Sequence, residues 1–305
     1  MTSARERGTA SRPALDLRHA LSISAQHDLT GIVRSRCVWA VALVALALSG
    51  CGGSPEPRPA PPRPTASSTP APRTDLAAVA ARARVPVLCY HQIRNPTRAD
   101  DAAARPYIVR PSVFSAQMRA LKQAGYTTIT GDQLFEHLLR GRPLPDKPVL
   151  LTFDDASAGQ YTHAFPVLRR HRFKATFFIM TVVLGKPGWL TSKQVRTLDR
   201  SGMTIGAHTW DHKAVPEYTD ADWQTQVTAP TRDLQRLVGH RVRLFAYPFG
   251  LYDSKAIPHL LRAGSRAAFQ LADDLDPRHP LWTIRRIIVP ELSGRELLRE
   301  MQTSF

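Results

Sequence analysis

Two adjacent carboxylates end an apolar run in the middle of the chain. Residues 150–155 read Leu-Leu-Thr-Phe-Asp-Asp, so Asp154 and Asp155 directly follow the last apolar residue. The run from Val149 to Phe153 is short, apolar and partly β-branched, which predicts a buried strand. We therefore expect the pair where a central strand meets its loop. Such a pair can also be solvated or cap a helix, so by itself it does not define a site.

Two histidines follow downstream in the segment His208-Thr-Trp-Asp-His212. Side chains at i and i+4 can face one way on a helical turn or from a tight loop. One carboxylate and two neutral imidazoles form a three-ligand metal site with an open position for water, as a hydrolytic metal requires. The second carboxylate would stay off the metal and take a proton from the water. His-x-x-x-His alone also occurs in packing, but its combination with the Asp pair favours a metal centre.

These segments resemble the signatures of the polysaccharide deacetylases of the NodB-homology type, carbohydrate esterase family 4. Thr-Phe-Asp-Asp is similar to the first signature, and His-Thr-x-x-His is similar to the second. Val85 to Ile93 resembles the opening strand of the branch that acts on poly-N-acetylglucosamine, and Phe-Ala-Tyr-Pro-Phe-Gly at 245–250 resembles its third signature. The resemblance spans roughly Val85 to Pro290, with the motifs in the expected order.

The resemblance implies hydrolysis of N-acetyl groups on an aminosugar polymer. It assigns Asp155, His208 and His212 as ligands of a divalent metal, with Zn²⁺ favoured and Co²⁺, Ni²⁺ and Mn²⁺ as alternatives. It assigns Asp154 as general base, although Asp154 could instead orient a ligand. The turn of Tyr247, Pro248, Phe249 and Gly250 would stabilise the oxyanion or bind substrate, with Phe249 N–H as the expected donor. A turn with only a structural role is the alternative.

The sequence departs from the family pattern in two places. Ala246 occupies the slot where many members carry an arginine that orients the catalytic Asp. Arg286 could take over that role, or it could be a surface residue of the last strand. The late Leu-x-His, whose His protonates the leaving amine, is absent after Leu281. His91, after the first strand, is our substitute, either as the acid or as a substrate contact; a packing role is the alternative.

Strands and amphipathic helices alternate after residue 85, which predicts a parallel α/β fold with its chemistry at the carboxyl ends of the strands. The family's fold is a distorted (β/α)7 barrel, and the number of elements is compatible with it. We expect strands at 86–90, 126–129, 149–153, 175–180, 203–207, 243–246, 267–269 and 283–288. We expect helices at 112–121, 132–139, 161–170, 191–200, 220–238, 254–263 and 293–301.

The first 51 residues predict an N-terminal extension and a lipoprotein signal peptide. Val38 to Leu48 is an apolar run behind Arg34 and Arg36, too short for an ordinary membrane span. It ends in Leu-Ser-Gly-Cys, so Cys51 is the expected lipidation site, and cleavage as an ordinary secretory signal is the alternative. The polar prefix is unusual for a signal peptide, and Val33 is a possible true start.

Residues 52–84 are predicted to be a linker rich in Pro, Ala and Ser, and 85–305 to be the deacetylase domain. Cys37 lies in the signal and Cys51 is the expected anchor, which leaves Cys89 alone in the domain without a disulfide partner. We expect a bacterial cell-envelope protein, lipid-anchored on the outer face of the cytoplasmic membrane or secreted.

The chain carries a formal net charge of +16. No nucleic-acid module accompanies this charge, so nucleic acid is not an expected partner, and no protein partner can be inferred. Attraction to anionic wall polymer or phospholipid headgroups is one interpretation, and a merely soluble basic surface is the other.

The expected partners are an N-acetylated polysaccharide and a membrane reached through the lipid anchor. Two other functions stay open. One is a deacylase of small amides or esters on the same scaffold, and the other is a polysaccharide-binding lipoprotein with little turnover. The particular polymer is not fixed by the sequence.

Overall fold

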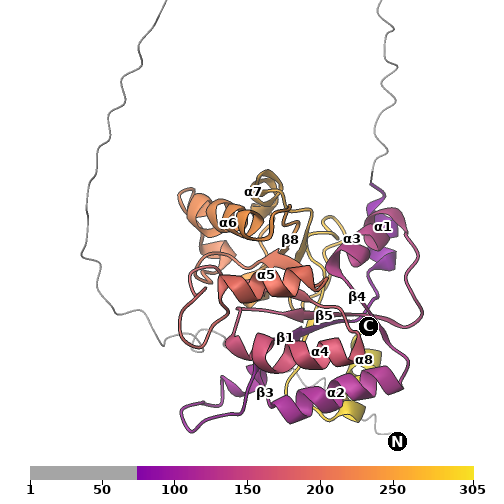
Figure 1. Cartoon of the computed structure of the whole chain (residues 1–305). Helices are drawn as coiled ribbons and strands as arrows, with labels where there is room; N and C mark the ends of the chain where they lie inside the picture. The colour runs from indigo at the N-terminus through magenta and orange to yellow at the C-terminus, as the bar shows by residue number, and fades with distance from the viewer. Residues whose placement is uncertain (1–73) are drawn as a thin grey trace, which may run out of the picture. The chain divides into compact units, whose positions relative to one another are not determined.

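The fold is built on a sheet in which every strand pairing is parallel (Figure 1). A computed structural model describes residues 74–305, so the signal peptide, Cys51 and most of the predicted linker lie outside the described residues. The main sheet has the order β10-β1-β5-β6-β7-β8-β9, and β4 pairs with β5 beside this path. Its strands are β1 (Val87–Tyr90), β4 (Thr127–Ile129), β5 (Pro148–Phe153), β6 (Thr176–Ile179), β7 (Thr204–Ala207), β8 (Leu244–Ala246), β9 (Ala267–Phe269) and β10 (Ile287–Ile288).

The sheet curls until its two ends meet across one segment of the chain. Ile284 bridges in parallel to Phe269 of β9, and three residues later Ile287 pairs with Leu88 of β1. Residues 284–288 therefore connect the last strand to the first. The predicted (β/α)7 barrel is confirmed, and it is distorted because β4 and β6 share one edge of β5.

The helices cover the outside of the sheet in the alternation that the sequence predicts (Figure 1). They pack on the outward side chains of the strands, such as Leu88, Leu151 and Phe177, in one large apolar cluster. The covering helices are α2 (Pro111–Gln123), α4 (Phe165–His171), α5 (Ser192–Arg200), α6 (Ala229–Val238), α7 (Ala256–Ala263) and α8 (Gly294–Ser304). No helix within 74–305 is long and apolar enough to cross a bilayer.

Alternate residues of the strands point into the barrel and form a second cluster. Val87, Leu150, Leu244 and Phe269 belong to this interior layer, because successive strand residues face opposite sides. The interior is tightly filled, and a Cβ at Gly206 of β7 would lie only 2.4 Å from the Phe178 ring. Residues 74–305 therefore bury a complete core of their own.

Two helices pack against this interior layer. α1 (Leu76–Arg82) and α3 (Gly131–Arg140) contact each other, and Val79 of α1 joins the interior cluster fully buried. The Arg82 guanidinium donates to the Leu138 carbonyl of α3. The predicted linker boundary at residue 84 is therefore too late, because Val79 places one apolar side chain on the core within an otherwise Ala-rich segment.

Two predicted helices are divided into a π segment and an α segment. Residues 220–238 contain the π segment Trp223–Thr228 followed by α6. The predicted helix 161–170 corresponds to the π segment Gln160–Ala164 followed by α4, which ends at His171. Pro230 and Pro166 stand in the first turn of each α segment. Proline lacks an N–H group, so regular i→i−4 bonding is interrupted there.

Short 3-10 turns and a two-stranded sheet complete the fold. β2 (Gln92–Ile93) pairs with β3 (Ile108–Val109) directly after β1, a pairing that the sequence did not indicate. The 3-10 turns are Arg105–Tyr107, Val215–Glu217 and Pro248–Gly250.

Candidate active site

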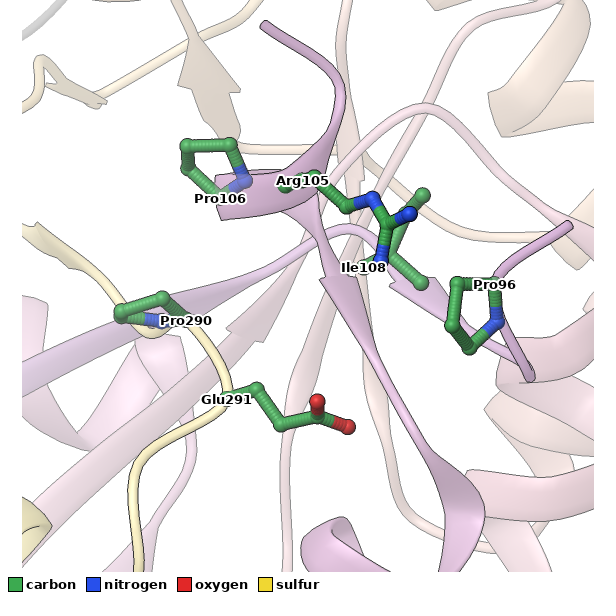
Figure 2. Close-up of a pocket in the computed structure, with 6 residues that line it drawn as sticks. All are labelled: Pro96, Arg105, Pro106, Ile108, Pro290 and Glu291. Carbon is green, nitrogen blue, oxygen red and sulfur yellow. The ribbon is translucent and has the colours of Figure 1, made fainter. Parts of the chain in front are cut away.

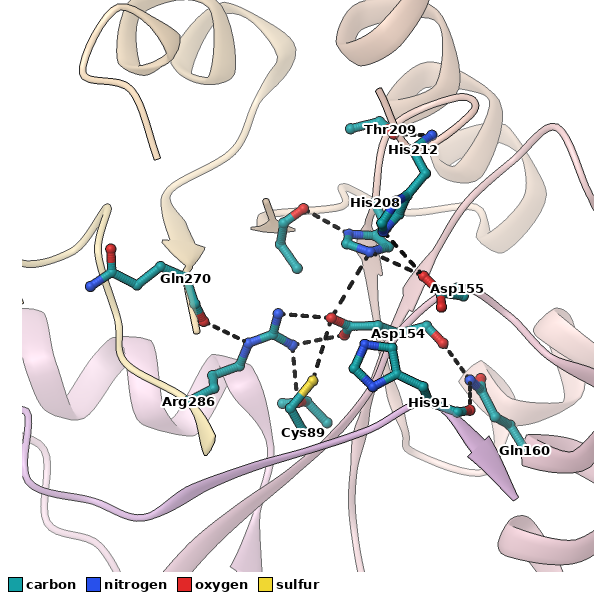
Figure 3. Close-up of polar contacts among 12 residues, drawn as sticks. Cys89, His91, Asp154, Asp155, Gln160, His208, Thr209, His212, Gln270 and Arg286 are labelled. Atoms are coloured by element: carbon teal, nitrogen blue, oxygen red, sulfur yellow. Dashed lines mark hydrogen bonds and ion pairs between the residues drawn. The ribbon is translucent and has the colours of Figure 1, made fainter. Parts of the chain in front are cut away.

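The carboxyl ends of four strands bring the predicted site residues together (Figure 3). Asp154 and Asp155 follow β5, His208 follows β7, and His91 follows β1. The turn that contains Phe249 follows β8, and the Phe249 ring packs edge-on against His212 with 4.4 Å between ring centroids. Parallel strands place these loops on one end of the barrel, as predicted.

Three possible metal-ligating atoms converge above β5. Asp155 Oδ1 lies 3.3 Å from His208 Nε2 and 3.4 Å from His212 Nε2. Asp155 Oδ1 and His208 Nε2 are both buried, yet neither has a hydrogen-bond partner among the described residues. Buried polar atoms rarely remain unpaired, so the three atoms face a common point rather than one another. The donor set, one carboxylate and two imidazoles, fits a divalent metal ion.

The backbone fixes which nitrogen of His208 faces this point. The Nδ1–H group of His208 donates to the Ala246 carbonyl at 2.8 Å, which leaves the Nε2 lone pair free. A ligating histidine is commonly oriented in this way by a carbonyl at its other nitrogen. The carbonyl of Ala246 therefore contributes to the site although its side chain lacks the family's guanidinium.

The loops at the site adopt a tight backbone rather than a helical turn. Asp155, Thr209, His212 and Phe249 all have positive φ angles, between 59° and 73°. Residues other than glycine adopt this region rarely, and such strain concentrates at functional sites. His212 N–H donates to Thr209 Oγ1 at 3.0 Å, which closes the loop between the two histidines.

Asp154 is held by a guanidinium rather than by the histidines. Arg286 donates from Nη1 to Oδ1 at 2.7 Å and from Nη2 to Oδ2 at 2.8 Å. Arg286 is fully buried, also donates to Thr152 Oγ1 and the Gln270 carbonyl, and faces the rings of Phe178 and Phe269. The structure thus places Arg286 where the orienting role requires it, inside the barrel and not on its surface.

The charges of the site favour a bound cation. Burial alone would raise the pKa of Asp154, but Arg286 and His208 outweigh it and hold that pKa below its usual value. The pKa of Asp155 is also lowered, because its histidine neighbours outweigh the effect of burial. Burial lowers the pKa of His212 to about 4, so this ring is neutral near pH 7. Burial opposes protonation of His208 too, but the two carboxylates outweigh it and raise the pKa of His208.

Within the turn after β8, only one of the predicted residues offers a free backbone N–H donor. The Tyr247 N–H group donates to Phe269 and the Gly250 N–H group to Tyr247, and Pro248 has none. The Tyr247 ring packs between Phe245 and Tyr252 in the outer layer. No partner for Phe249 N–H occurs among the described residues, so Phe249 is the candidate oxyanion donor and the other three shape the turn.

His91 lies beside Asp154, with a ring nitrogen within 4.8 Å of a carboxylate oxygen. Its Nδ1 atom is buried without a partner, and its ring packs edge-on against Tyr107. Gln160 Nε2 donates to the carbonyls of both His91 and Asp154 and joins the two loops (Figure 3). Burial lowers the pKa of His91 despite the nearby carboxylates, so the ring is neutral near pH 7.

Sequence reasoning missed four residues around the Asp154–Arg286 pair: Cys89 and Gln160 contact Asp154, and Thr152 and Gln270 accept from Arg286. Cys89 is buried, and its Sγ lies 3.5 Å from Asp154 Oδ2. Cys89, His91 and Asp154 also form a group that could hold a metal. Both Asp154 oxygens accept from Arg286, however, so a cation there would lie against the guanidinium, and the Asp155 group is the better fit. The two-residue alternation of β1 and β5 was the signal that could have placed Cys89 and Thr152 inside the barrel.

A groove of about 450 Å³ lies on the same end of the barrel (Figure 2). It is close to His91, because the His91 ring packs against Tyr107, which stands between the lining residues Pro106 and Ile108. One wall comes from the segment around β3, and the other from the residues after β10. Both lie beside the first strands of the chain, since Ile108 pairs with Gln92 and the Val289 N–H group donates to the Cys89 carbonyl. Four apolar and two charged residues line it: Pro96, Arg105, Pro106, Ile108, Pro290 and Glu291.

Comparison with known proteins agrees with this geometry. Residues 141–268 match the polysaccharide deacetylase family. The chain is 26% identical over 218 residues to YxkH of Bacillus subtilis (strain 168), provisionally named a polysaccharide deacetylase, covering 70% of this chain and 74% of that protein. It is 23% identical over 235 residues to the poly-beta-1,6-N-acetyl-D-glucosamine N-deacetylase of Staphylococcus aureus (strain NCTC 8325 / PS 47), covering 70% and 81%.

A solved structure matches the fold over the same part of the chain. The Streptococcus pyogenes deacetylase PplD in complex with acetate superposes with a TM-score of 0.65 at 25% identity, covering 71% of this chain and 97% of that one. The fold, the ordered signatures and these matches lead to one conclusion. The chain contains a polysaccharide deacetylase domain of the NodB-homology type, and the protein is a hydrolase of that kind.

Proposed function

We propose that the protein removes N-acetyl groups from a polymer of the poly-β-1,6-N-acetylglucosamine kind, using a divalent metal, with zinc favoured. The observation that carries the proposal is the convergence of Asp155, His208 and His212 beside a separately held Asp154. Similarity to the staphylococcal enzyme of that substrate and to the opening strand of that branch supports the choice of polymer.

Asp155 Oδ1 and the Nε2 atoms of His208 and His212 are the atoms that would hold the metal. When bound, the ion would polarise the acetamide carbonyl and make water more acidic. Two carboxylates and one guanidinium would leave one net negative charge when both imidazoles are neutral, as metal ligation requires, and a divalent ion would balance that charge.

Asp154 acts as the general base. Arg286 keeps it ionised and fixes both oxygens, so the carboxylate is ready to accept a proton from the attacking water. The water oxygen bonds to the acetyl carbon, the carbon–nitrogen bond breaks, and the leaving nitrogen must gain a proton. Phe249 N–H donates to the carbonyl oxygen while it carries negative charge.

His91 serves the leaving group. Its neutral ring presents an unpartnered nitrogen beside Asp154, so it contacts the substrate by hydrogen bonding before the reaction. The proton that Asp154 takes from water passes to His91, which then donates it to the leaving nitrogen. No proton from outside the site is needed.

The groove beside His91 binds sugar units next to the one that reacts. Proline and isoleucine side chains offer apolar surface to the faces of the rings, and Arg105 and Glu291 offer hydrogen bonds to hydroxyl or amide groups. Its position along the site favours a polymer over a small amide or ester.

We also propose that Cys51 is lipidated after signal cleavage and holds the enzyme at the outer face of the cytoplasmic membrane. The lipoprotein signal in the sequence supports this, together with the Pro-rich segment that follows it.

Acetate release is the test. The purified protein, stripped with a chelator and then reloaded with Zn²⁺, Co²⁺, Ni²⁺ or Mn²⁺, is assayed on β-1,6-linked N-acetylglucosamine oligomers, chitooligosaccharides and aryl acetates. We expect metal-dependent turnover that is greatest on the β-1,6 oligomers. Full activity in metal-free protein contradicts the mechanism, turnover confined to aryl acetates indicates a small-molecule deacylase, and oligomer binding without acetate release indicates a binding protein.

A further inference from the structure

The two ends of the barrel differ in charge. The loops that lead into the strands, at the end opposite the site, carry mostly arginine and lysine. Examples are Arg84 before β1, Arg142 and Lys147 before β5, Arg241 and Arg243 before β8, and Arg266 before β9. The acids at this end are Asp146 in the loop before β5, and Asp132 of α3 and Asp199 of α5 beside Arg241 and Arg243. The loops at the catalytic end are richer in acids: Asp100, Asp101, Asp154, Asp155, Asp211, Glu217, Asp220, Asp222, Asp253, Asp273, Asp274, Asp276 and Glu291.

The basic residues are densest where α2 and α4 end, and we call this group the basic patch. It consists of Arg119 and Lys122 of α2, Arg169, Arg170 and His171 of α4, and Arg172 and Lys174 before β6. α2 and α4 pack against each other, so the two sets lie side by side (Figure 1). Burial, and then the charges of Arg170, Arg119 and Lys122, lower the pKa of His171, which agrees with their closeness.

The basic patch has no acidic partner among the described residues. None of its side chains forms an ion pair with an Asp or a Glu, although Arg94, Arg110, Arg140 and Arg236 elsewhere in the described part all do. Arg170 and Arg172 are exposed at its centre. Hollows of about 460 and 470 Å³ flank Arg169, and Tyr161 and Phe165 line the first of them. The patch thus offers uncompensated charge beside apolar rings.

The chain enters the barrel at this same end. α1 precedes β1, so the segment that follows the proposed lipid anchor joins the domain on the end that carries the basic loops. If the basic loops contact lipid, the active site at the opposite end of the barrel faces away from it.

We propose that the basic patch docks on an anionic phospholipid surface and orients the active site away from the membrane, towards polymer. The broad spread of charge over several loops fits a surface of headgroups better than one defined ligand, because each basic side chain near such a surface contributes separately. The proposal goes beyond the deacetylase activity and does not depend on it, but its orientation rests in part on the proposed lipid anchor at Cys51.

Vesicle co-sedimentation tests the proposal with residues 52–305, the form expected after processing but without the lipid. The patch variant changes Arg119, Lys122, Arg170 and Arg172 to Gln, side chains without hydrogen bonds in the structure. The control variant changes Arg98, Lys186, Lys193 and Lys255 to Gln, which removes the same charge from the catalytic end. Vesicles contain phosphatidylcholine alone or with phosphatidylglycerol, at low and high salt.

We expect binding to the phosphatidylglycerol vesicles only, weakened by salt, and weakened about tenfold or more in the patch variant but not in the control. Equal melting temperatures and equal acetate release on a soluble oligomer would show that both variants keep their fold and activity. Equal vesicle binding by both variants would overturn the proposal. So would stronger binding to soluble polyglycerol phosphate than to vesicles of equal phosphate content, which would point to a wall polymer instead.

Discussion

Asp154 and Asp155 are neighbours in sequence with different surroundings. Asp155 faces two imidazole nitrogens at 3.3 and 3.4 Å, whereas both Asp154 oxygens are occupied by Arg286. A carboxylate already paired with a guanidinium is a poor additional metal ligand. Neutralising each residue should therefore affect metal binding and catalysis differently.

Asp155→Asn should lower both metal content and activity, because the lost charge belongs to a ligand. Asp154→Asn should keep the metal and lower mainly kcat, by about 10²–10⁴, the usual contribution of a general base. Elemental analysis beside steady-state kinetics on an N-acetylated oligomer measures both effects. Loss of metal in the Asp154 variant with retention in the Asp155 variant would mean that the roles are reversed.

Arg286→Met should destabilise the protein by about 3–5 kcal/mol, because it leaves the buried Asp154 carboxylate without its partner. The double variant Arg286→Met/Asp154→Asn should regain part of this stability while staying inactive, since the unpaired charge is gone but the base is missing. Urea denaturation gives the free energies of unfolding. Arg285→Met, on the neighbouring and less buried residue, is the control, and an equal loss there would show that the Asp154 pair is not the cause.

At the scale of elements, α1 contributes more to the stability of the domain than its Ala-rich composition suggests. Val79 is fully buried among the interior side chains of the barrel, whereas Leu76 of the same helix is 41% exposed. Val79→Asp should therefore destabilise the domain by about 2–4 kcal/mol, and Leu76→Asp by much less. Thermal or urea unfolding of the two variants measures the difference, and equal values would mean that α1 does not anchor to the core.

The groove formed by β3 and the residues after β10 should make activity depend on polymer length. Arg105→Ala should lower kcat/KM about tenfold or more for oligomers long enough to reach the groove, which is the contribution of one charged hydrogen bond, and leave disaccharides unaffected. Arg98→Ala is the control, because Arg98 is equally exposed but does not line the groove. A uniform effect on all chain lengths would contradict a subsite for neighbouring sugars.

At the scale of the whole molecule, the proposals place a catalytic domain on a lipid anchor. Cys51→Ser should release the protein from the membrane fraction without altering acetate release, because the active site lies in the separate domain. Fractionation of cells followed by immunoblotting measures this. Persistent membrane association would indicate that Val38 to Leu48 remains uncleaved as the anchor.

The role of the basic run Arg169-Arg170-His171-Arg172-Phe173-Lys174 depends on its neighbours in the folded structure. In the sequence it closes one helix and leads into a strand, where basic residues also complement the helix dipole. Only the packing of α4 on α2 brings Arg119 and Lys122 beside it. Only the position of the run at the end opposite the site makes orientation on a membrane a question that can be tested.

The sequence alone determined the strand–helix order, the candidate metal-ligand triad and the Asp pair, because their signatures are local. A strand followed by Asp-Asp, and a His-x-x-x-His loop after another, can be recognised without knowing what lies opposite. Arg286 was a tentative partner for Asp154, since 132 residues separate them. Their contact depends on β10 pairing beside β1 and on Arg286 facing the interior. Likewise, the free N–H of Phe249, the burial of Cys89 and the docking of Val79 follow from closure of the barrel, which sets the neighbours of each inward side chain and which strand periodicity does not encode.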